Sequence, residues 1–350
     1  MPDIRRILVI GPSNIGDSIL MSPVVQHVHE RFPEAALTLL TGERAQPLFE
    51  GDPRVRQLLC VDDFHGAVGR AKLAGLIWRI RPDALIDLRQ TVLPLVWKPW
   101  RALRYFRPVP EVIVHARDRH LWRMERQLGQ PSAKFEAGSS KTKSAAPNPS
   151  NFELRTPSCP VWISDRDRAY VDSLLRRWAV SDARRLVVFC PGARSHIKRW
   201  PVERFAELAD RLIQRQKVEV VVSGEPDEGP IVKEMLAAMR GRAHSAVGSI
   251  AIRQLGALME RAALVLTNDS AALHMACAVS APVVAIFGPT DFRRYGPTGA
   301  RDRVIRRRLF CAPCQRALCR FSHECMRFIH VEEVYAAAAA LLDGSSARQP

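Results

Sequence analysis

The sequence predicts an α/β protein built from two doubly wound lobes. Short apolar runs of strand length alternate with segments of helical period, both before residue 131 and after residue 160. At 350 residues the chain is long enough for two domains, each with its own core. Residues 131–160 are rich in Ser, Ala, Pro and Lys without any apolar period, which predicts a flexible linker or insertion between the lobes.

The apolar runs predict strands in both lobes. In the first lobe, residues 1–130, strands are expected at 6–11, 36–40, 55–61 and 84–88, and helices at 18–31, 44–50 and 67–80. From residue 161 onward, strands are expected at 186–190, 218–223, 246–247, 263–267 and 282–287. Helices are expected there at 164–178, 202–214, 230–240, 252–261, 271–279 and 331–342.

The chain is strongly basic, with a net charge of +16. Nucleic acid, an anionic membrane surface or a phosphorylated acceptor would each complement this charge, and a solvated basic surface explains it equally. Residues 91–130 interleave aromatic side chains with arginines. Such a segment can bind single-stranded nucleic acid or anionic lipid headgroups, or it can be a helical face with buried aromatics.

The N-terminus runs directly from a short polar head into a strand, without the long apolar region of a secretory signal. No apolar run approaches the roughly 18–20 residues that a spanning helix needs. A cytoplasmic location is therefore expected, with the eight cysteines mostly reduced.

Residues 263–287 form the most informative stretch. A buried strand is followed by Asn268, Asp269 and Ser270, residue types that begin helices, and then by a helix and a second strand. Such a turn presents free backbone N–H groups and a positive helix end above the sheet. It therefore favours binding of a diphosphate.

Three blocks together carry a family resemblance: ILVIGPSNIGDSILMSPVVQHVHERFP, FCPGARSHIKRWPVERFAELADRL, and TNDSAALHMACAVSAPVVAIFGPTD followed by RRYGP. In this order they resemble the ADP-heptose:lipopolysaccharide heptosyltransferases, glycosyltransferase family 9. The resemblance covers most of the chain outside residues 131–160. It implies a GT-B fold, in which two Rossmann-like lobes face each other across a cleft. The first lobe would bind the acceptor and residues 161–330 the nucleotide sugar, with the helix in 331–350 returning to the first lobe.

The resemblance implies an inverting, metal-independent transfer of a heptose or similar sugar from an ADP-sugar to a lipopolysaccharide core acceptor, without a cofactor. The implied partners are the ADP-sugar donor, a lipid-linked anionic saccharide and the inner-leaflet membrane surface, and no nucleic acid. A peripheral position at the inner face of the bacterial inner membrane follows. Two alternatives stay open: another nucleotide-sugar transferase or epimerase on the same fold, and a basic nucleic-acid-binding α/β protein.

Two residues are candidates for catalysis. Asp17 follows the first strand and occupies the place of the family's GD pair, whose aspartate is regarded as the base that activates the acceptor hydroxyl. On its residue type alone it is equally a helix-capping residue. Lys198 matches the KxWP lysine of the family, which contacts the diphosphate and would stabilise the leaving group. A lysine in a basic loop is otherwise plain surface.

Five further residues are candidates for donor binding around these loops. Backbone N–H groups of Ser270 and Ala271 should meet the phosphates, although the family commonly has glycine where Ala271 stands. Asp269 would repel a diphosphate, so it is expected to orient sugar hydroxyls or the loop itself. His274 matches the family's histidine and could bind a phosphate, or it is a core residue. Ser195 supplies the local hydroxyl near Lys198.

Asp227 and Glu228 follow the strand at 218–223, where acidic groups can hold ribose hydroxyls; a solvated turn is the alternative. The G-x-G-x-x-G fingerprint is absent after the first strand of each lobe, which argues against a nicotinamide oxidoreductase.

Four cysteines precede the last helix in the spacing C-x2-C-x4-C-x5-C: Cys311, Cys314, Cys319 and Cys325. Their number makes them a weak candidate for a structural zinc site, with disulfides and buried thiols as alternatives. A similar cysteine-rich patch occurs in many members of the family that the chain resembles.

Overall fold

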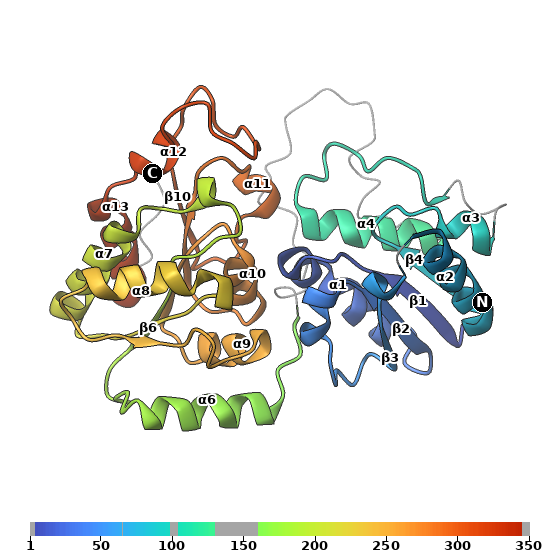
Figure 1. Cartoon of the computed structure of the whole chain (residues 1–350), viewed down its shortest axis with the longest axis horizontal. Coiled ribbons are helices and arrows are strands. Elements are labelled where there is room, and N and C mark those ends of the chain that lie inside the picture. The colour runs from blue at the N-terminus through green and yellow to red at the C-terminus, as the bar shows by residue number, and fades with distance from the viewer. Residues whose placement is uncertain (1–3, 65, 99–103, 130–159, 345–350) are drawn as a thin grey trace. The chain divides into compact units, whose positions relative to one another are not determined.

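The computed structural model describes residues 4–64, 66–98, 104–129 and 160–344. The chain divides into two compact units, residues 1–160 and 161–350. Each unit contains one parallel sheet with helices around it (Figure 1). Residues 131–160, where a flexible linker or insertion was expected, lie outside the described ranges except for Pro160.

The first unit contains a four-stranded parallel sheet in the order β3-β2-β1-β4. The register places Ile10 at the end of β1 beside Leu40 of β2 and Asp87 of β4. The elements of this unit are β1 (Arg6–Ile10), α1 (Ile15–Arg31), β2 (Ala36–Thr41), η1 (Glu43–Leu48), β3 (Gln57–Cys60), η2 (Val61–Asp63), α2 (Gly66–Ile80), β4 (Ala84–Asp87), α3 (Leu93–Trp97) and α4 (Ala116–Leu128).

The second unit contains a six-stranded parallel sheet in the order β10-β9-β8-β5-β6-β7. This is the strand order of a dinucleotide-binding Rossmann fold. Its elements are α6 (Asp165–Arg177), β5 (Leu186–Cys190), η5 (His196–Lys198), α7 (Val202–Gln216), β6 (Glu219–Val222), η6 (Pro226–Glu228), α8 (Gly229–Ala238), β7 (His244–Ser245), α9 (Ile252–Glu260), β8 (Leu264–Asn268), α10 (Ala271–Ala278), β9 (Val283–Phe287), α11 (Phe292–Tyr295), β10 (Arg303–Arg306), α12 (Glu324–Arg327) and α13 (Val331–Leu342).

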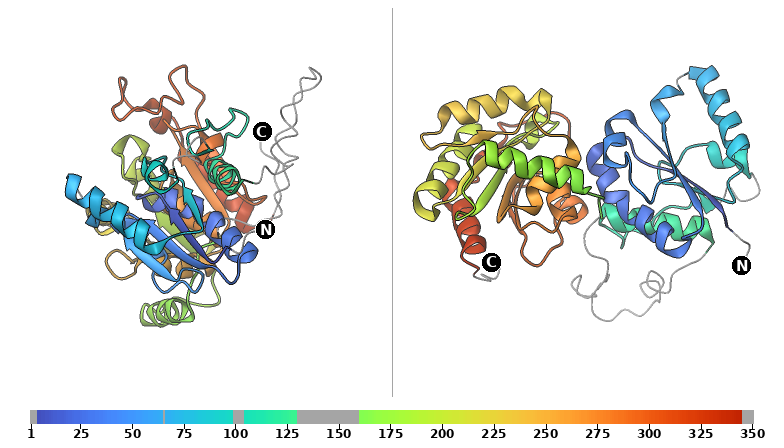
Figure 2. Two further views of the ribbon diagram at one scale, coloured as in Figure 1. Left: turned by 90° about the vertical axis from the view of Figure 1, so that its right-hand side faces the viewer. Right: turned by 90° about the horizontal axis from the view of Figure 1, so that it is seen from below.

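Helices cover both faces of the second sheet, as Figure 2 shows. Successive strand residues point to opposite faces, so a strand that is apolar throughout must be covered on both sides. On one face α7 packs beside α8 and α13, and on the other α9 packs beside α6 and α10. All five residues of β5, β8 and β9 are buried, in agreement with this double cover.

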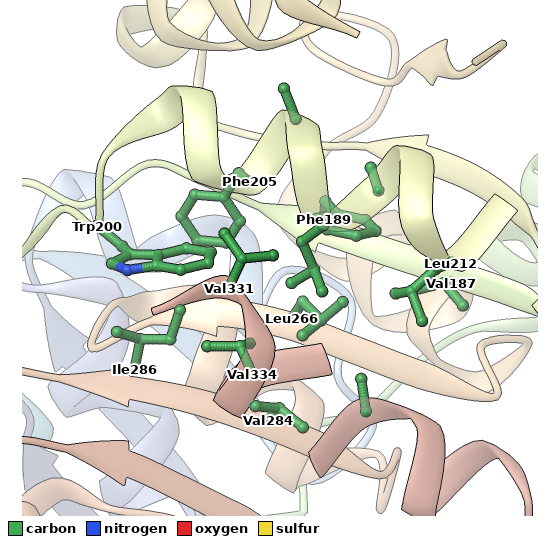
Figure 3. Packing of buried hydrophobic residues seen from close by; sticks show 14 of the residues in the cluster. Val187, Phe189, Trp200, Phe205, Leu212, Leu266, Val284, Ile286, Val331 and Val334 are labelled. Carbon is green, nitrogen blue, oxygen red and sulfur yellow. The ribbon is translucent and has the colours of Figure 1, made fainter. Parts of the chain in front are cut away.

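The core between the second sheet and α7 contains the largest fully buried side chain, that of Trp200. Its ring packs edge-on against Phe205, which in turn meets Phe189 of β5 (Figure 3). The indole Nε1 donates a hydrogen bond to the carbonyl of Ile329, at 3.0 Å. Truncating a buried tryptophan of this kind generally costs about 3–5 kcal/mol. Trp200 therefore fixes the chain just after the Lys198 loop.

Helix α13 packs in the core of the second unit, in contrast to its predicted position. It was expected to return to the first lobe, but its buried residues Val331, Val334, Ala338 and Leu342 belong to the core of the second unit (Figure 3). They pack together with the apolar face of α7. The physical reason is that α13 buries its apolar side chains against the apolar surface of α7 and the sheet within its own unit.

Several elements were not predicted, among them β10 and α4. Strand β10 has the sequence RVIR, in which arginines hide the apolar period, and it pairs with the buried strand β9. Helix α4 lies in the arginine-rich segment that gave no clear pattern. Its buried side chains include Leu121, Trp122 and Met124. In the part of the chain that the structure describes, no helix has the length and apolarity needed to cross a membrane.

Helix α4 also buries a histidine. His120 is 8% exposed, and its Nδ1 atom has no hydrogen-bond partner within the described ranges. Burial, and after it the nearby charges of Arg123, Arg119 and His115, lower the pKa of His120 to about 3. The side chain is therefore neutral in the folded protein at any ordinary pH.

Replacing this residue, His120→Gln, should reduce the sensitivity of the protein to mild acid. The unfolded chain binds a proton at His120 below pH 6.5, whereas the folded chain does so only below about pH 3. This contribution to stability is thus complete above pH 6.5 and falls as the pH drops toward 3. Between pH 7 and pH 5 the wild type should lose about 2 kcal/mol of unfolding free energy through this group, measured by urea denaturation.

The matched control is His29→Gln, which changes an exposed histidine of α1 in the same unit. It should keep the wild-type pH dependence. If His120→Gln kept the wild-type dependence of unfolding free energy on pH, the lowered pKa of His120 would be contradicted.

Candidate functional site

The ends of β5 and β8 define the centre of the second unit's candidate site. These strands are neighbours, and the sheet is extended from them in opposite directions. In open parallel sheets ligands bind at such a switch point, outside the carboxyl ends of the strands. The loops that leave β5 and β8 contain Lys198 and Asp269.

Asn268, the last residue of β8, connects the two loops. Its side chain is fully buried. Its Nδ2 donates to the carbonyl of Pro191 at 2.7 Å, and its Oδ1 accepts the backbone N–H of Trp200 at 3.0 Å. The amide therefore bonds both ends of the loop that contains Lys198. The prediction that Asn268 belongs to the helix-capping turn is wrong, because the strand extends through it.

Lys198 and Asp269 form an ion pair. Lys198 Nζ lies 2.7 Å from Asp269 Oδ2, which also accepts the hydroxyl of Thr290 at 2.6 Å. The side chain of Asp269 is 5% exposed and that of Lys198 is 31% exposed. Because an ammonium group has three donors, Lys198 keeps N–H groups for a ligand. Asp269 thus binds the loop, one of the two roles expected for it, and it lowers the net charge of this side of the site.

Helix α10 begins directly beside this ion pair. Ser270 is its N-cap residue, and the Ser270 hydroxyl lies 3.3 Å from that of Thr267. Ala271 is half-buried at the first helical position. The first N–H groups of a helix have no intrahelical acceptors and are suited to bind an anion. His274, one turn further, is buried, and Ser195 lies half-buried before η5.

Glu228 lies against the loop after β5. A Cβ atom at Gly192 would come within 2.1 Å of the Glu228 carboxyl carbon, so only glycine fits there without displacing Glu228. Glu228 Oε2 accepts the N–H of Glu225 at 2.9 Å. Burial, and after it the charge of Glu228, raise the pKa of the Cys190 thiol, which stays protonated. Asp227 is exposed on η6, so of the two predicted acidic residues only Glu228 contacts the site loops.

In the first unit, Asp17 lies in the first turn of α1. The helix begins at Ile15 rather than at residue 18, so Asp17 is not its N-cap residue, which is Asn14. Asn14 Nδ2 lies 3.4 Å from Asp17 Oδ2. The carboxylate is half-buried in the first turn of a 17-residue helix.

Arg89 lies beside the same loop. It follows β4, the neighbour of β1, and its Nη1 donates to the Ser13 hydroxyl at 2.9 Å. The chain around it is held by Asp87, which is fully buried and accepts N–H groups of Arg89 and Thr91. Burial raises the pKa of Asp87, against hydrogen bonds that lower it. An exposed guanidinium on a well-held backbone therefore contacts the loop between β1 and α1.

The aromatic residues of the arginine-rich segment are partly withdrawn from the surface. Trp122 and Tyr105 are each 4% exposed, and the Tyr105 hydroxyl donates to the carbonyl of Leu85. They cannot stack on nucleotide bases, which is how such segments bind single strands. The interpretation as an arginine-rich helical face with buried aromatics fits α4. Trp100 and Arg101 lie outside the described residues.

The four cysteines border a pocket of about 420 Å³ in front of α12. All four are free thiols. Burial, and after it the neighbouring thiols of Cys319, Cys314 and Cys311, raise the pKa of Cys325 to about 11. Among the residues that the structure describes, no group of three or more His, Cys, Asp or Glu side chains is arranged to hold a metal ion. The zinc alternative for these four cysteines stays a prediction.

Two parallel-sheet units, one of them with the 3-2-1-4-5-6 strand order and a helix N-terminus at its switch point, agree with the GT-B class of folds, which the similar solved structures share. A family model described as glycosyltransferase family 9 (heptosyltransferase) matches residues 139–324, more than half of the chain. The chain belongs to this family, and the protein is a glycosyltransferase.

Individual relatives agree with this assignment. Lipopolysaccharide heptosyltransferase 2 of Escherichia coli K12 is 28% identical over 324 residues, covering 86% of this chain and 88% of the relative. The crystal structure of the family 9 glycosyl transferase from Veillonella parvula superposes with a TM-score of 0.75 at 22% identity, covering 97% of this chain and 98% of that one. The Escherichia coli ADP-heptose lps heptosyltransferase II gives 0.72 at 22% identity, with coverages of 97% and 99%.

Sequence reasoning missed two contributors to the site. Thr290 was not singled out, although its hydroxyl shares Asp269 with Lys198. The signal was the Gly288-Pro289-Thr290 turn after a buried strand, at the sheet edge where ligands bind. Arg89 was not singled out either, and its position shortly after the strand β4 was the signal that could have identified it.

The variant Gly192→Ala should destabilise the second unit through its contact with Glu228. The new methyl group would displace the Glu228 carboxylate and leave the Glu225 N–H without its acceptor. We expect a loss of about 1 kcal/mol in unfolding free energy, measured by urea denaturation. In the Glu228→Ala background the same substitution should cost much less. Equal costs in both backgrounds would contradict the contact.

Proposed function

We propose that the protein transfers a heptose from an ADP-sugar to the lipopolysaccharide core, with inversion and without a metal ion. The observation that carries the proposal is the Lys198–Asp269 ion pair beside the N-terminus of α10, at the switch point of a Rossmann-type sheet. The relatives whose names state a heptosyltransferase activity support the choice of sugar and acceptor.

The donor diphosphate would bind between Lys198 and the first N–H groups of α10. One Lys198 N–H is used by Asp269, which fixes the direction of the ammonium and leaves its other donors for phosphate oxygens. Ser195 and His274 flank this position and would add hydrogen bonds. A fixed cation and a helix end can together neutralise a leaving diphosphate, so the reaction would need no divalent metal.

The sugar and the nucleoside would be held by the acidic residues. Asp269 uses Oδ2 for Lys198 and Thr290, and its Oδ1 makes no hydrogen bond in the described part of the chain. This oxygen is suited to accept a sugar hydroxyl. Glu228, against Gly192 at the end of β5, is the candidate for the ribose hydroxyls, with Asp227 as an exposed neighbour.

Asp17 would act as the base on the acceptor side. Its carboxylate, in the first turn of α1, is the group that would accept the proton. The acceptor hydroxyl would lose its proton to Asp17 while its oxygen attacks the anomeric carbon. The new C–O bond forms as the bond to the phosphate oxygen breaks on the opposite face, and ADP leaves. Arg89, beside the same loop, would contact an anionic group of the acceptor.

The alternative function is transfer from a different nucleotide sugar by the same residues, and the presence of Ala271 favours this alternative. Its methyl group stands where the family commonly has glycine, directly at the first helical N–H. The nucleic-acid alternative is disfavoured by the burial of Tyr105 and Trp122. The acceptor is lipid-linked in this proposal, so the enzyme would act from the cytoplasm at the inner leaflet as a peripheral protein.

A donor screen tests the proposal directly. Calorimetry against ADP-, UDP- and GDP-sugars should show binding of ADP-heptose above the others. Transfer to a core acceptor should continue in EDTA, and proton NMR of the product should show the anomeric configuration opposite to that of the donor. Selective binding of a UDP-sugar would favour the alternative donor, and tight salt-dependent binding of generic DNA alone would favour a nucleic-acid function.

The variant Asp17→Asn should lower turnover by about 10²–10⁴-fold, because the amide cannot accept the proton. ADP affinity should be unchanged, since Asp17 lies in the first unit and the proposed donor site in the second. Asp63→Asn, which changes an exposed carboxylate of η2, is the control and should keep full activity. Retained turnover in Asp17→Asn would exclude Asp17 as the base.

The variant Lys198→Ala should weaken both donor binding and turnover. The ammonium would bind the diphosphate in the intact donor and would also stabilise the charge that develops on it as the bond to the sugar breaks. We expect a loss of about 10²–10³-fold in kcat, measured with saturating donor, and a raised Kd for ADP. Lys233→Ala, on an exposed position of α8, is the matched control. Normal ADP affinity in Lys198→Ala would place the diphosphate elsewhere.

A further inference from the structure

The loop between β10 and α12, residues 307–323, contains the most exposed large apolar side chain of the described chain. Phe310 is 92% exposed, Leu318 is 71% exposed and Phe321 is 48% exposed. The two phenylalanine rings meet edge-on, with centroids 5.3 Å apart. All three side chains line the 420 Å³ pocket, so they form one apolar patch. A patch of this kind normally marks an interaction surface.

The charge of the same loop is of one sign. Arg308, Arg316 and Arg320 are exposed, and none of them forms an ion pair within the described part of the chain. Residues 307–323 contain no Asp or Glu. Arg307, the remaining arginine, is instead paired with Glu333 of α13. An apolar patch surrounded by unpaired arginines complements the interface of an anionic bilayer, where apolar side chains enter between headgroups and arginines meet phosphates.

The loop is joined to the candidate donor site. The Gln315 N–H donates to the carbonyl of Pro289 at 2.8 Å, and Pro289 precedes the Thr290 that contacts Asp269. His323 packs against His196, two residues before Lys198, with ring centroids 5.6 Å apart. Figure 1 shows this loop extending from the second unit beyond α12. A surface that contacts the loop would therefore lie close to the place where the sugar is transferred.

We propose that residues 307–323 dock onto an anionic lipid bilayer, with Phe310, Leu318 and Phe321 inserted between the headgroups and Arg308, Arg316 and Arg320 on the lipid phosphates. This deepens the proposed function, since a lipid-linked acceptor is presented at such a surface. The chemistry is that of a peripheral contact, with apolar insertion supplying affinity and arginines supplying selectivity for anionic lipid.

Vesicle flotation of the full chain tests this docking. The wild type should bind vesicles of equal parts phosphatidylethanolamine and phosphatidylglycerol and should bind phosphatidylcholine vesicles far more weakly. The triple variant Arg308→Gln/Arg316→Gln/Arg320→Gln should lose on the order of a hundredfold in partition coefficient, roughly fivefold per arginine. The triple variant Phe310→Ser/Leu318→Ser/Phe321→Ser should bind neither kind of vesicle.

Matched controls separate this surface from general charge and apolarity. Arg166→Gln/Arg176→Gln/Arg177→Gln removes three exposed arginines from α6 in the same unit, and Trp78→Ser removes an exposed apolar side chain from α2. Both should bind vesicles nearly as the wild type does. Thermal unfolding and ADP binding of each variant verify that the fold is intact.

Three outcomes would overturn the docking proposal. Equal binding to neutral and anionic vesicles would remove the role of the arginines. Unchanged vesicle binding in the apolar variant, together with a smaller mass by light scattering, would identify the patch as a contact between copies of the chain. An equal loss in the α6 control would show that net charge alone drives binding. Flotation measures membrane binding and not sugar transfer. The docking proposal can therefore be supported or rejected independently of whether the proposed transfer reaction is found.

Discussion

The buried side chain of Asn268 is the interaction on which the candidate donor site depends. A primary amide can donate and accept at once, and here it accepts from Trp200 and donates to Pro191 with no exposure to water. An unsatisfied buried amide would cost about 1–3 kcal/mol, so the two loops are held in one arrangement. The ion pair of Lys198 with Asp269 follows from this, because Asp269 is the next residue in the chain. Its geometry is thus set by the protein before any ligand arrives.

Much of the fold could be predicted because its strands are short, wholly apolar and bounded by turns. Residues 186–190 and 331–342 were predicted with the bounds that the structure has, and the GT-B class is confirmed by the structural relatives. The strand β10 could not be predicted, because only its pairing with β9 makes RVIR extended. The packing of α13 on its own unit depends on which apolar surface is left uncovered, and a periodicity contains no such information.

The candidate site shows the same limit at the level of side chains. Local patterns placed Lys198, Asp269 and Ser270 at strand ends, which a parallel sheet brings to one edge. They did not show that Lys198 and Asp269 would pair across 71 positions of sequence, or that Thr290 would share the carboxylate. The electrostatic argument that Asp269 would repel a diphosphate treated it as unpaired. The catalytic roles of these residues stay predictions, because the structure fixes positions and not reactivity.

The two hydrogen bonds of Trp200 limit the local mobility of the segment that contains Lys198. Its backbone N–H is bonded to Asn268 and its indole to the carbonyl of Ile329, while the ring is enclosed in the core. The segment that contains Lys198 therefore cannot detach at this end without exposing the largest buried side chain of the chain. It belongs to the cooperative folding unit, unlike an ordinary surface loop, which exchanges its amide hydrogens by local opening. The wall of the candidate donor site that contains Lys198 is in this sense anchored in the hydrophobic core.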